Sequence, residues 1–96
     1  MKFEWDEEKN KENIRKRELD FNDAWEIFNA PMLTNLDTRE DYGEDRRVGI
    51  GFLKNFVVVV TFTERPDVIR IISLRKALKH ERTRFEEALR NELGEG

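Results

Sequence analysis

The 96-residue sequence contains no cysteine, one histidine and two prolines, and it has no long hydrophobic run. The absence of cysteine excludes a disulfide-stabilised fold and any thiolate metal site. The single histidine, His80, argues against both a histidine-based metal centre and a serine triad. The longest apolar stretch, Phe56 to Val60, is far shorter than the roughly 20 residues of a membrane-spanning helix. The first residues also lack the apolar segment of a signal peptide, so we expect a cytoplasmic protein.

The common short motifs of enzyme sites are missing as well. The sequence has no P-loop, no G-x-G-x-x-G, no G-x-S-x-G and no H-E-x-x-H. These motifs would indicate phosphate binding, dinucleotide binding, a hydrolase nucleophile and a metalloprotease site, respectively. We therefore expect neither a bound metal ion nor a cofactor.

Charged residues are abundant and unevenly distributed. They form 41% of the chain, against about 25% in an average globular domain. The net charge of −3 is the sum of two halves of opposite charge. Residues 1–45 carry 7 basic and 14 acidic side chains, whereas residues 46–96 carry 11 basic and 7 acidic side chains. The basic excess from Arg65 to Arg84 favours a polyanion partner, and a solvated helix surface is the alternative. The length and the ten aromatic residues predict one folded domain, residues 1–96.

The first third of the chain has the pattern of one strand and two helices. Residues 3–5 alternate apolar and polar side chains, as in a strand. Asp6 can cap a helix over residues 9–17, in which Ile14 is the only clear apolar anchor. An apolar stripe predicts a second helix and consists of Phe21, Ala24, Trp25 and Phe28. We expect Trp25 to lie in the core.

Four strands and a final helix are predicted for the rest of the chain. Residues 56–62 are apolar on both faces, which is typical of a central strand. Gly49 and Gly51 lie on one face of the preceding strand and indicate a close approach by a partner backbone, a helix or a ligand. The final helix is expected from about Arg75 to Leu93, ended by Gly94. The resulting order, β-α-α-β-β-β-β-α, predicts an α+β fold with helices packed on an antiparallel sheet. The four strand patterns cover residues 32–37, 46–53, 56–62 and 68–74.

Arginines on or beside the predicted sheet are the main candidates for chemistry. The planar guanidinium suits phosphate oxygens, and it can stabilise the charged phosphorane that forms when a 2′-hydroxyl attacks in RNA cleavage. Glu64 or His80 could assist the proton transfer. A salt bridge is the alternative role for each arginine, and Arg70 could pair with Glu81 on the apolar face of the final helix. The five candidates are Arg46, Arg47, Arg65, Arg70 and Arg75.

Several short segments become specific through their order and spacing. They are Phe3-Glu4-Trp5-Asp6 with Lys9, Asn13 and Lys16; then Phe21, Ala24, Phe28 and Pro31; then Gly43-Glu44-Asp45-Arg46-Arg47 with Ile50-Gly51; then Thr63-Glu64-Arg65; and finally Arg70-Ile71-Ile72-Ser73-Leu74-Arg75-Lys76-Ala77 with Glu81. Together they resemble the BrnT family of type II toxins from residue 3 to about residue 87.

The resemblance implies a RelE-like fold and a ribonuclease that cleaves RNA independently of the ribosome. It also implies a BrnA-like antitoxin, a ribbon-helix-helix protein that joins the toxin in a heterotetramer and alone contacts operator DNA. On this basis we expect phosphate or transition-state contacts from Arg47, Arg65, Arg70 and Arg75. Further RNA contacts are expected from Lys9, Lys16, Arg17 and Lys76.

Two positions depart from the family pattern. Relatives usually carry a histidine where this chain has Arg17, and a tyrosine is common where it has Phe85. Arginine binds phosphate, but with a pKa above about 12 it is a poor proton shuttle. The alternative function is therefore a weakened or inactive homologue that acts as an interaction or co-repressor module. Direct DNA binding by this chain is disfavoured by its acidic first half and by the lack of a recognition helix.

Overall fold

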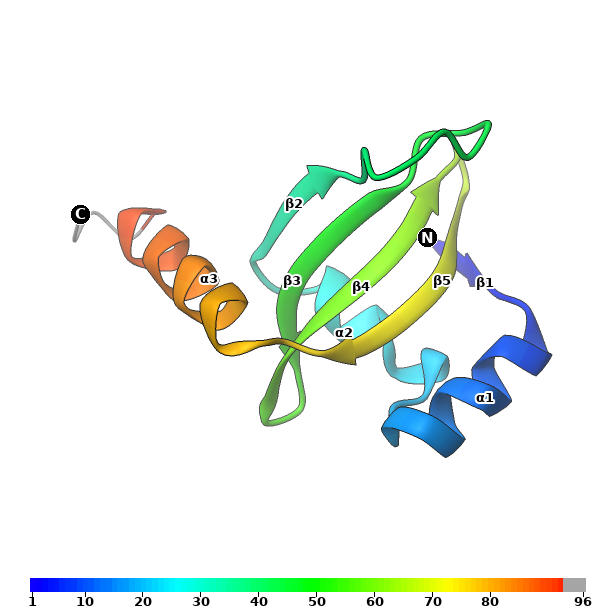
Figure 1. Cartoon of the computed structure of the whole chain (residues 1–96), viewed down its shortest axis with the longest axis horizontal. Coiled ribbons are helices and arrows are strands. Elements are labelled where there is room, and N and C mark those ends of the chain that lie inside the picture. The colour runs from blue at the N-terminus through cyan, green and yellow to red at the C-terminus, as the bar shows by residue number, and fades with distance from the viewer. Residues whose placement is uncertain (93–96) are drawn as a thin grey trace.

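The computed structural model describes residues 1–92, which form an α+β fold on one five-stranded sheet (Figure 1). The strands are β1 (Lys2–Glu4), β2 (Met32–Leu36), β3 (Arg47–Leu53), β4 (Phe56–Glu64) and β5 (Val68–Lys76). The helices are α1 (Glu7–Arg17), the 3-10 helix η1 (Phe21–Asp23), α2 (Trp25–Phe28) and α3 (Lys79–Glu92). This confirms the predicted order, although the expected stop at Gly94 lies outside the described residues. No helix within residues 1–92 is long and apolar enough to cross a lipid bilayer.

The sheet is mixed, with the spatial order β1-β5-β4-β3-β2. Strands β2 to β5 pair antiparallel, and β4 is the central strand as predicted. The short β1 pairs with β5 in the parallel direction, so the expectation of a wholly antiparallel sheet is wrong at this edge. The direction of β1 could not be read from the sequence, because no hairpin turn links it to its neighbour.

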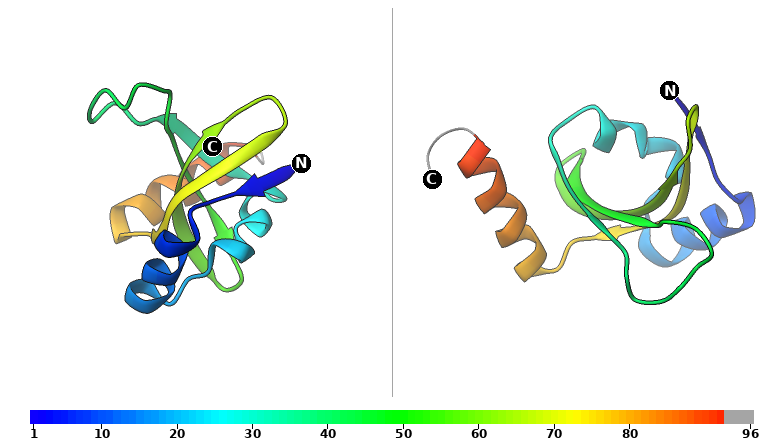
Figure 2. Two further views of the ribbon diagram at one scale, coloured as in Figure 1. Left: turned by 90° about the vertical axis from the view of Figure 1, so that its right-hand side faces the viewer. Right: turned by 90° about the horizontal axis from the view of Figure 1, so that it is seen from above.

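The two faces of the strongly curved sheet are covered differently (Figure 2). We call the face that packs against α1, η1 and α2 the first face, and the opposite face the second face. The second face carries a smaller core, in which Phe85 of α3 packs with Ile50, Val59 and Ala77. Because α3 covers only this part, the rest of the second face is available for a site. The buried core of the first face consists of Leu19, Phe21, Ala24, Ile27, Leu53, Val58, Val60, Phe62, Ile69, Ile71 and Leu74.

Close packing against the first face explains the two glycines of β3. A Cβ atom on Gly49 would lie 2.6 Å from Sδ of Met32, and one on Gly51 would lie 2.8 Å from Cγ2 of Ile27. Both distances are far inside van der Waals contact, so a side chain at Gly49 would displace the Met32 side chain, and one at Gly51 would crowd Ile27 of α2. The expected close approach at the two glycines is confirmed.

Helix α1 begins at the predicted cap, but its apolar anchor was predicted wrongly. The Asp6 carboxylate accepts hydrogen bonds from the backbone N–H groups of Glu8, at 2.9 Å, and Lys9, at 3.3 Å. Ile14 is 41% exposed, and the buried residues of the helix are Asn10 and Asn13. A polar residue at a buried position gives no signal in an apolar periodicity, which is why the anchor was missed.

The two buried asparagines attach α1 to the rest of the fold through hydrogen bonds. Asn10 Nδ2 donates to Asp20 Oδ1 at 2.9 Å, and Asn10 Oδ1 accepts from the backbone N–H of Phe21 at 2.8 Å. Asn13 Nδ2 donates to the Leu19 carbonyl at 2.9 Å, and its Oδ1 accepts from a backbone N–H of β5. Each amide therefore has both a donor and an acceptor satisfied, as buried polar groups require.

The predicted second helix is divided, and its tryptophan is not in the core. A 3-10 turn forms the start of the segment and α2 the remainder. The 3-10 turn has 3.0 residues per turn rather than 3.6, so the apolar stripe expected for one continuous α-helix changes phase. Trp25 is consequently 49% exposed, while Ile27, which lay outside the predicted stripe, is fully buried.

Strand β5 extends further than predicted, into the segment assigned to the final helix. Arg75 and Lys76 are strand residues that pair with Val59 and Val58 of β4, and α3 begins only at Lys79. Leu78, which lies between β5 and α3, is 55% exposed. Pairing with the central strand overrides the helix-compatible sequence of this segment. The result is that Arg75 stands on the sheet.

Candidate functional site

A cavity of about 680 Å³ lies on the part of the second face that α3 leaves open. Strands β3, β4 and β5 form its floor, and its walls come from the end of α1, the β2–β3 loop and α3. Its lining is rich in arginine and in hydroxyl groups. The lining residues are Arg17, Leu36, Asp37, Thr38, Arg39, Val48, Val59, Thr61, Ser73, Arg75 and Arg84.

Strand register brings the polar floor residues together. Thr61 of β4 pairs with Ser73 of β5, and Val59 pairs with Arg75. Because side chains alternate along a strand, all four lie on the second face. A register shift at Thr61 and Phe62 adds one residue to β5. This bulge places Arg70 and Arg75 on the same face, although they are an odd number of positions apart.

Arg75 is held at the floor by Glu81, in the first turn of α3. Its Nη1 and Nη2 donate to Glu81 Oε1 and Oε2, each at 2.8 Å. Hydrogen bonding to Arg75 lowers the pKa of Glu81 to about 2, although partial burial of the carboxylate opposes this shift. The same pair raises the pKa of Arg75. The partner of Glu81 is an arginine of the sheet, but it is not Arg70, the arginine that the sequence suggested, because the extension of β5 brings Arg75 to the start of α3.

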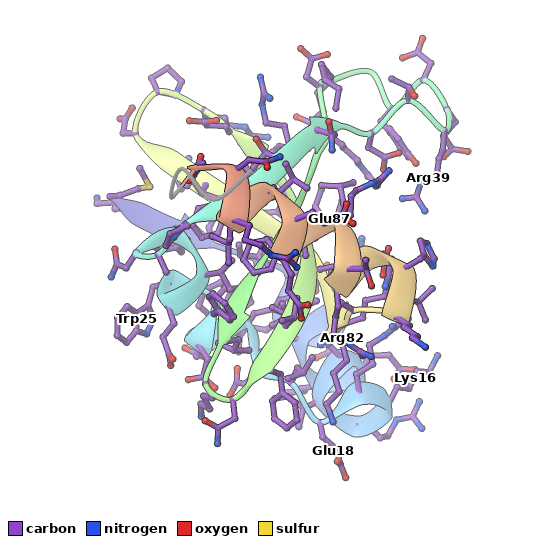
Figure 3. All side chains as sticks on the ribbon, turned by 90° about the vertical axis from the view of Figure 1, so that its left-hand side faces the viewer. Lys16, Glu18, Trp25, Arg39, Arg82 and Glu87 are labelled. Atoms are coloured by element: carbon purple, nitrogen blue, oxygen red, sulfur yellow. The ribbon has the colours of Figure 1, made fainter. Side chains whose placement is uncertain are left out.

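A second bidentate pair lies on the loop side of the cavity. Arg39 donates from Nε to Asp37 Oδ1 at 2.8 Å and from Nη2 to Oδ2 at 2.7 Å. These bonds lower the pKa of the buried Asp37 carboxylate to about 2 and raise the pKa of Arg39. The Arg39 charge slightly opposes the net rise in the pKa of Arg75, which is caused mainly by the hydrogen bonds to Glu81. Figure 3 shows Arg39 and Lys16 extending to the same side of the molecule.

Arg17 and Arg84 complete the basic lining without a fixed partner. Arg17 is the last residue of α1, and Arg84 lies on α3. Within residues 1–92, no carboxylate lies within ion-pair distance of either guanidinium. The cavity therefore combines two arginines that are held in place with two that have no carboxylate partner in the described part of the chain.

A smaller hollow of about 260 Å³ adjoins the cavity and shares Arg17 and Ser73 with it. Lys9 and Lys16, two of the residues expected to bind RNA, line this hollow with Arg17. Lys16 is exposed and forms a 2.9 Å ion pair with Glu12. The fourth expected contact, Lys76, lies over the Phe56 ring at 4.3 Å and does not line either space.

Arg65 and Arg70 form a separate cluster outside the cavity. Arg70 Nη1 donates to Glu4 Oε2 at 2.9 Å, and Arg65 lies 3.8 Å from the same oxygen. Arg65 also lies 3.5 Å from Glu44. Both arginines are thus engaged by carboxylates from the acidic first half of the chain, the structural role that the sequence left open for them.

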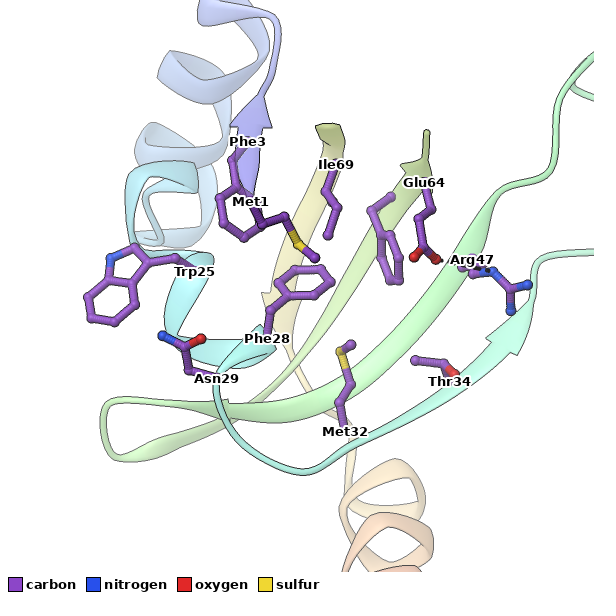
Figure 4. A pocket seen from close by; sticks show the side chains of 11 residues that line it. Met1, Phe3, Trp25, Phe28, Asn29, Met32, Thr34, Arg47, Glu64 and Ile69 are labelled. Atoms are coloured by element: carbon purple, nitrogen blue, oxygen red, sulfur yellow. Dashed lines mark ion pairs between the residues drawn. The ribbon is translucent and has the colours of Figure 1, made fainter. Parts of the chain in front are cut away.

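Arg47 lies on the first face, away from the other candidates. Its backbone pairs with Phe62, and its side chain lies at the rim of an apolar pocket of about 460 Å³ (Figure 4). Glu64 lies on the same rim, 3.9 Å from Arg47, with Phe3 and Phe28 inside the pocket and Trp25 at its edge. The neighbouring Arg46 stacks on the Tyr42 ring at 4.0 Å. The structure therefore brings only Arg75 of the expected catalytic arginines into the cavity.

The residues expected to transfer protons do not reach this cavity. Glu64 is on the first face, and His80 is exposed on α3 outside the cavity lining. The one carboxylate that lines the cavity, Asp37, is held ionised by Arg39. Within residues 1–92, no three carboxylate or imidazole side chains are grouped closely enough to hold a metal ion. The site is therefore suited to bind a polyanion and to stabilise negative charge.

Four residues that line the cavity were not predicted as site residues from the sequence: Arg39, Thr61, Ser73 and Arg84. Arg39 lies in a loop that reads as acidic, and nothing in the sequence places that loop beside β5. Arg84 was counted in the basic run, and its position three residues after Glu81 is the signal that could have placed it on the same helix face. Thr61 and Ser73 follow from strand alternation once the register is known.

Comparison with known protein families identifies the group to which this chain belongs. No curated protein matches the chain. A family model described as the ribonuclease toxin BrnT of type II toxin–antitoxin systems matches residues 5–81. The matched segment runs from the first strand's end to Glu81, and it includes Arg17, Arg39 and Arg75 of the cavity. The chain therefore belongs to the BrnT family of ribonuclease toxins of type II toxin–antitoxin systems.

Proposed function

We propose that this chain is the toxin of a type II toxin–antitoxin pair and cleaves RNA without the ribosome, at the second-face cavity. Family membership supports the class of activity. The observation that carries the location is the convergence of four arginines from four separate segments on one cavity. A single salt-bridge role does not explain this convergence, because two of the four have no carboxylate partner within residues 1–92.

The cavity chemistry fits attack of a ribose 2′-hydroxyl on the adjacent phosphate. Arg17 and Arg84 attract the RNA backbone, and Arg75 and Arg39 present their remaining N–H groups to the phosphate oxygens. As the phosphorane forms, its added negative charge is stabilised by guanidinium groups that are already in place. Proton transfer falls to solvent water, because Arg17 stands where relatives carry a histidine. We therefore expect slow cleavage.

The proposed partner is a BrnA-like ribbon-helix-helix antitoxin that joins the toxin in a heterotetramer in the cytoplasm. An acidic segment of that antitoxin would neutralise the toxin by covering the arginines that bind RNA. Operator DNA would be contacted through the antitoxin alone, because the ribbon-helix-helix protein supplies the DNA-binding element.

A second candidate function rests on the same Arg17 position. Without an imidazole in the cavity, the chain would serve as a catalytically weakened toxin homologue that retains the antitoxin-binding and co-repressor role. This candidate requires the fold and the basic cavity but no RNA cleavage.

Induction of the chain alone in a bacterium distinguishes the two functions. The ribonuclease function predicts arrested growth and degraded RNA, relieved by co-expression of the proposed BrnA-like antitoxin. The Arg17→Gln/Arg84→Gln double variant should restore growth, because it removes the two arginines proposed to attract the RNA backbone. It should still fold, because neither arginine pairs with a carboxylate within residues 1–92. Arg90→Gln, on the same helix as Arg84 but outside the cavity, is the matched control and should remain toxic. Normal growth with intact RNA, in cells that accumulate folded wild-type protein, would overturn the ribonuclease in favour of the second candidate.

A further inference from the structure

A carboxylate, that of Glu81, lies beside the floor of the proposed anion-binding cavity. Glu81 lies directly against Arg75, and its side chain is only 14% exposed. A negative charge at this point opposes the approach of an RNA phosphate, and partial burial of the carboxylate adds a desolvation cost. Both costs must be offset by the hydrogen bonds that Glu81 accepts.

The two carboxylate oxygens of Glu81 have different partners. Oε1 accepts from Arg75 Nη1 and from the backbone N–H of Leu78, both at 2.8 Å. Oε2 accepts only from Arg75 Nη2, also at 2.8 Å. The bond from Leu78 ties the start of α3, whereas the second oxygen serves the guanidinium alone. A helix-capping role thus accounts for one oxygen of Glu81 and leaves the other unexplained.

The bidentate contact fixes the plane of the Arg75 guanidinium. It uses one hydrogen from each Nη, and Nη1 also donates to the Lys76 carbonyl at 3.3 Å. Nε–H and the second hydrogen of Nη2 are left for a ligand. An arginine without such a contact samples many rotamers, at an entropy of about 2 kcal/mol that a ligand would have to remove. Arg39 is held by Asp37 in the same bidentate way across the cavity.

We propose that Glu81 is a positioning residue for RNA cleavage, which holds the Arg75 guanidinium rigid at the cavity floor so that it meets the phosphorane in the transition state. This inference rests on the proposed ribonuclease function and adds a residue that touches neither the RNA nor the reacting atoms. Glu81 acts through Arg75, so its removal affects the transition state more than the binding of RNA by Arg17 and Arg84.

The Glu81→Gln variant separates positioning from helix capping. Its amide oxygen can still accept from the Leu78 N–H, but the amide nitrogen cannot accept from Arg75 Nη2. We expect kcat on a single-stranded RNA to fall about 10- to 100-fold, the range produced by misplacing a catalytic group by about 1 Å. KM and the affinity for a 2′-O-methyl RNA, which cannot undergo 2′-hydroxyl attack, should change by less than about threefold. Glu87→Gln, an exposed position on the same helix, is the control and should keep the wild-type kcat.

A double-mutant cycle with Arg75→Gln provides the decisive readout. If Glu81 acts through Arg75, adding Glu81→Gln to Arg75→Gln causes no further loss of kcat. Glu81→Asp, whose shorter side chain cannot make the bidentate contact, should lower kcat as Glu81→Gln does, and it replaces that variant if Glu81→Gln fails to fold.

The measured kcat values and RNA affinities distinguish failure of the positioning role from failure of the proposed function. A wild-type protein that cleaves RNA while Glu81→Gln retains its kcat would overturn the positioning role alone. Additive losses in the double mutant, or a fall in RNA affinity equal to the fall in kcat, would also overturn it. A folded wild-type protein that neither binds nor cleaves RNA would overturn the proposed function, and the positioning role with it.

Discussion

At the residue scale, the arginines of the cavity fall into two groups with different physical roles. Arg39 and Arg75 are each fixed by a carboxylate through two hydrogen bonds. Arg17 and Arg84 have no carboxylate partner within residues 1–92, so they can adapt to an incoming backbone. Fixed guanidinium groups suit a transition state whose geometry is defined, and mobile ones suit attraction of a flexible polyanion.

Arg17→His tests whether the missing imidazole limits the rate. A histidine at the end of α1 would add a group that titrates near pH 6.5 to the cavity wall. We predict that RNA cleavage at pH 7 rises about 10- to 100-fold over the wild type, the lower part of the range for general acid–base catalysis. The rate should also acquire a pH dependence centred near 6 to 7, measured on a fluorescent RNA substrate.

The control for this gain is Arg15→His, an exposed position on the same helix outside the cavity. It should cleave at the wild-type rate. A rate for Arg17→His no higher than that of Arg17→Gln would show that an imidazole at this position cannot transfer the proton.

The two held carboxylates also predict a pH dependence of stability. Asp37 and Glu81 have pKa values near 2 in the folded chain, against ordinary values of 3.8 and 4.5. Because the folded-state pKa is the lower one, their contribution is complete above about pH 5 and is lost as pH falls toward 2. We expect the free energy of unfolding in urea to be smaller at pH 3 than at pH 7. The decline should be shallower for Glu81→Gln than for the control Glu87→Gln, and parallel declines would contradict this linkage.

At the scale of the elements, pattern and spacing predicted the identity of the strands and helices but not their exact phase. Alternation and short turns located β2 to β5, since those strands pair with neighbours in sequence. The end of β5 and the division of the second helix could not be predicted, because both depend on packing against distant segments. No sequence feature predicts the bulge in β5 opposite Thr61 and Phe62, which places Arg70 on the same face as Arg75.

Placement of the candidate arginines failed for the same reason. Arginine chemistry and the resemblance selected Arg47, Arg65, Arg70 and Arg75 correctly as sheet-associated residues. Which face each one occupies depends on strand register, and which carboxylate each one meets depends on tertiary folding. Arg75 reaches the cavity because β5 continues two residues beyond the predicted strand end at Leu74, to Lys76.

The docking of α1 provides a test at the level of one helix. The buried amide of Asn13 bonds to the Leu19 carbonyl and to β5, whereas Ile14 beside it is 41% exposed. Asn13→Ala leaves a buried carbonyl and a buried N–H without a partner, so it should lower the free energy of unfolding by about 1–3 kcal/mol. Ile14→Ala, the matched control, should lower it by less than about 1 kcal/mol.

Urea unfolding followed by circular dichroism measures both values. A larger loss for Ile14→Ala than for Asn13→Ala would show that apolar burial, not the buried amide, anchors α1.

At the scale of the whole molecule, the unequal charge of the two halves has a structural meaning. Glu4 and Glu44 of the acidic half neutralise Arg65 and Arg70 of the basic half. The arginines of the second-face cavity are left with a local excess of positive charge, despite the net charge of −3. The small net charge therefore does not describe the surface that an RNA would meet.

This separation of charge predicts how salt affects RNA binding. Each cavity arginine that contacts a phosphate releases counterions, so its removal should reduce the slope of log affinity against log salt by about 0.7 for single-stranded RNA. Arg17→Gln and Arg84→Gln should each show this reduction for a 2′-O-methyl RNA, and the effects should add. Arg90→Gln should leave the slope unchanged, and an equal reduction for all three variants would indicate a diffuse surface rather than the cavity.

Cleavage of purified, ribosome-free RNA by the purified chain and by its Arg17→Gln/Arg84→Gln variant tests whether the second-face cavity is a ribonuclease site. We predict that the wild-type protein cuts the RNA and leaves 2′,3′-cyclic phosphate ends, the product of 2′-hydroxyl attack. It also predicts that the folded double variant loses most of this activity while Arg90→Gln retains it. Cleavage at the wild-type rate by the double variant, or none by the folded wild-type chain, would contradict the assignment of the second-face cavity as a ribonuclease site.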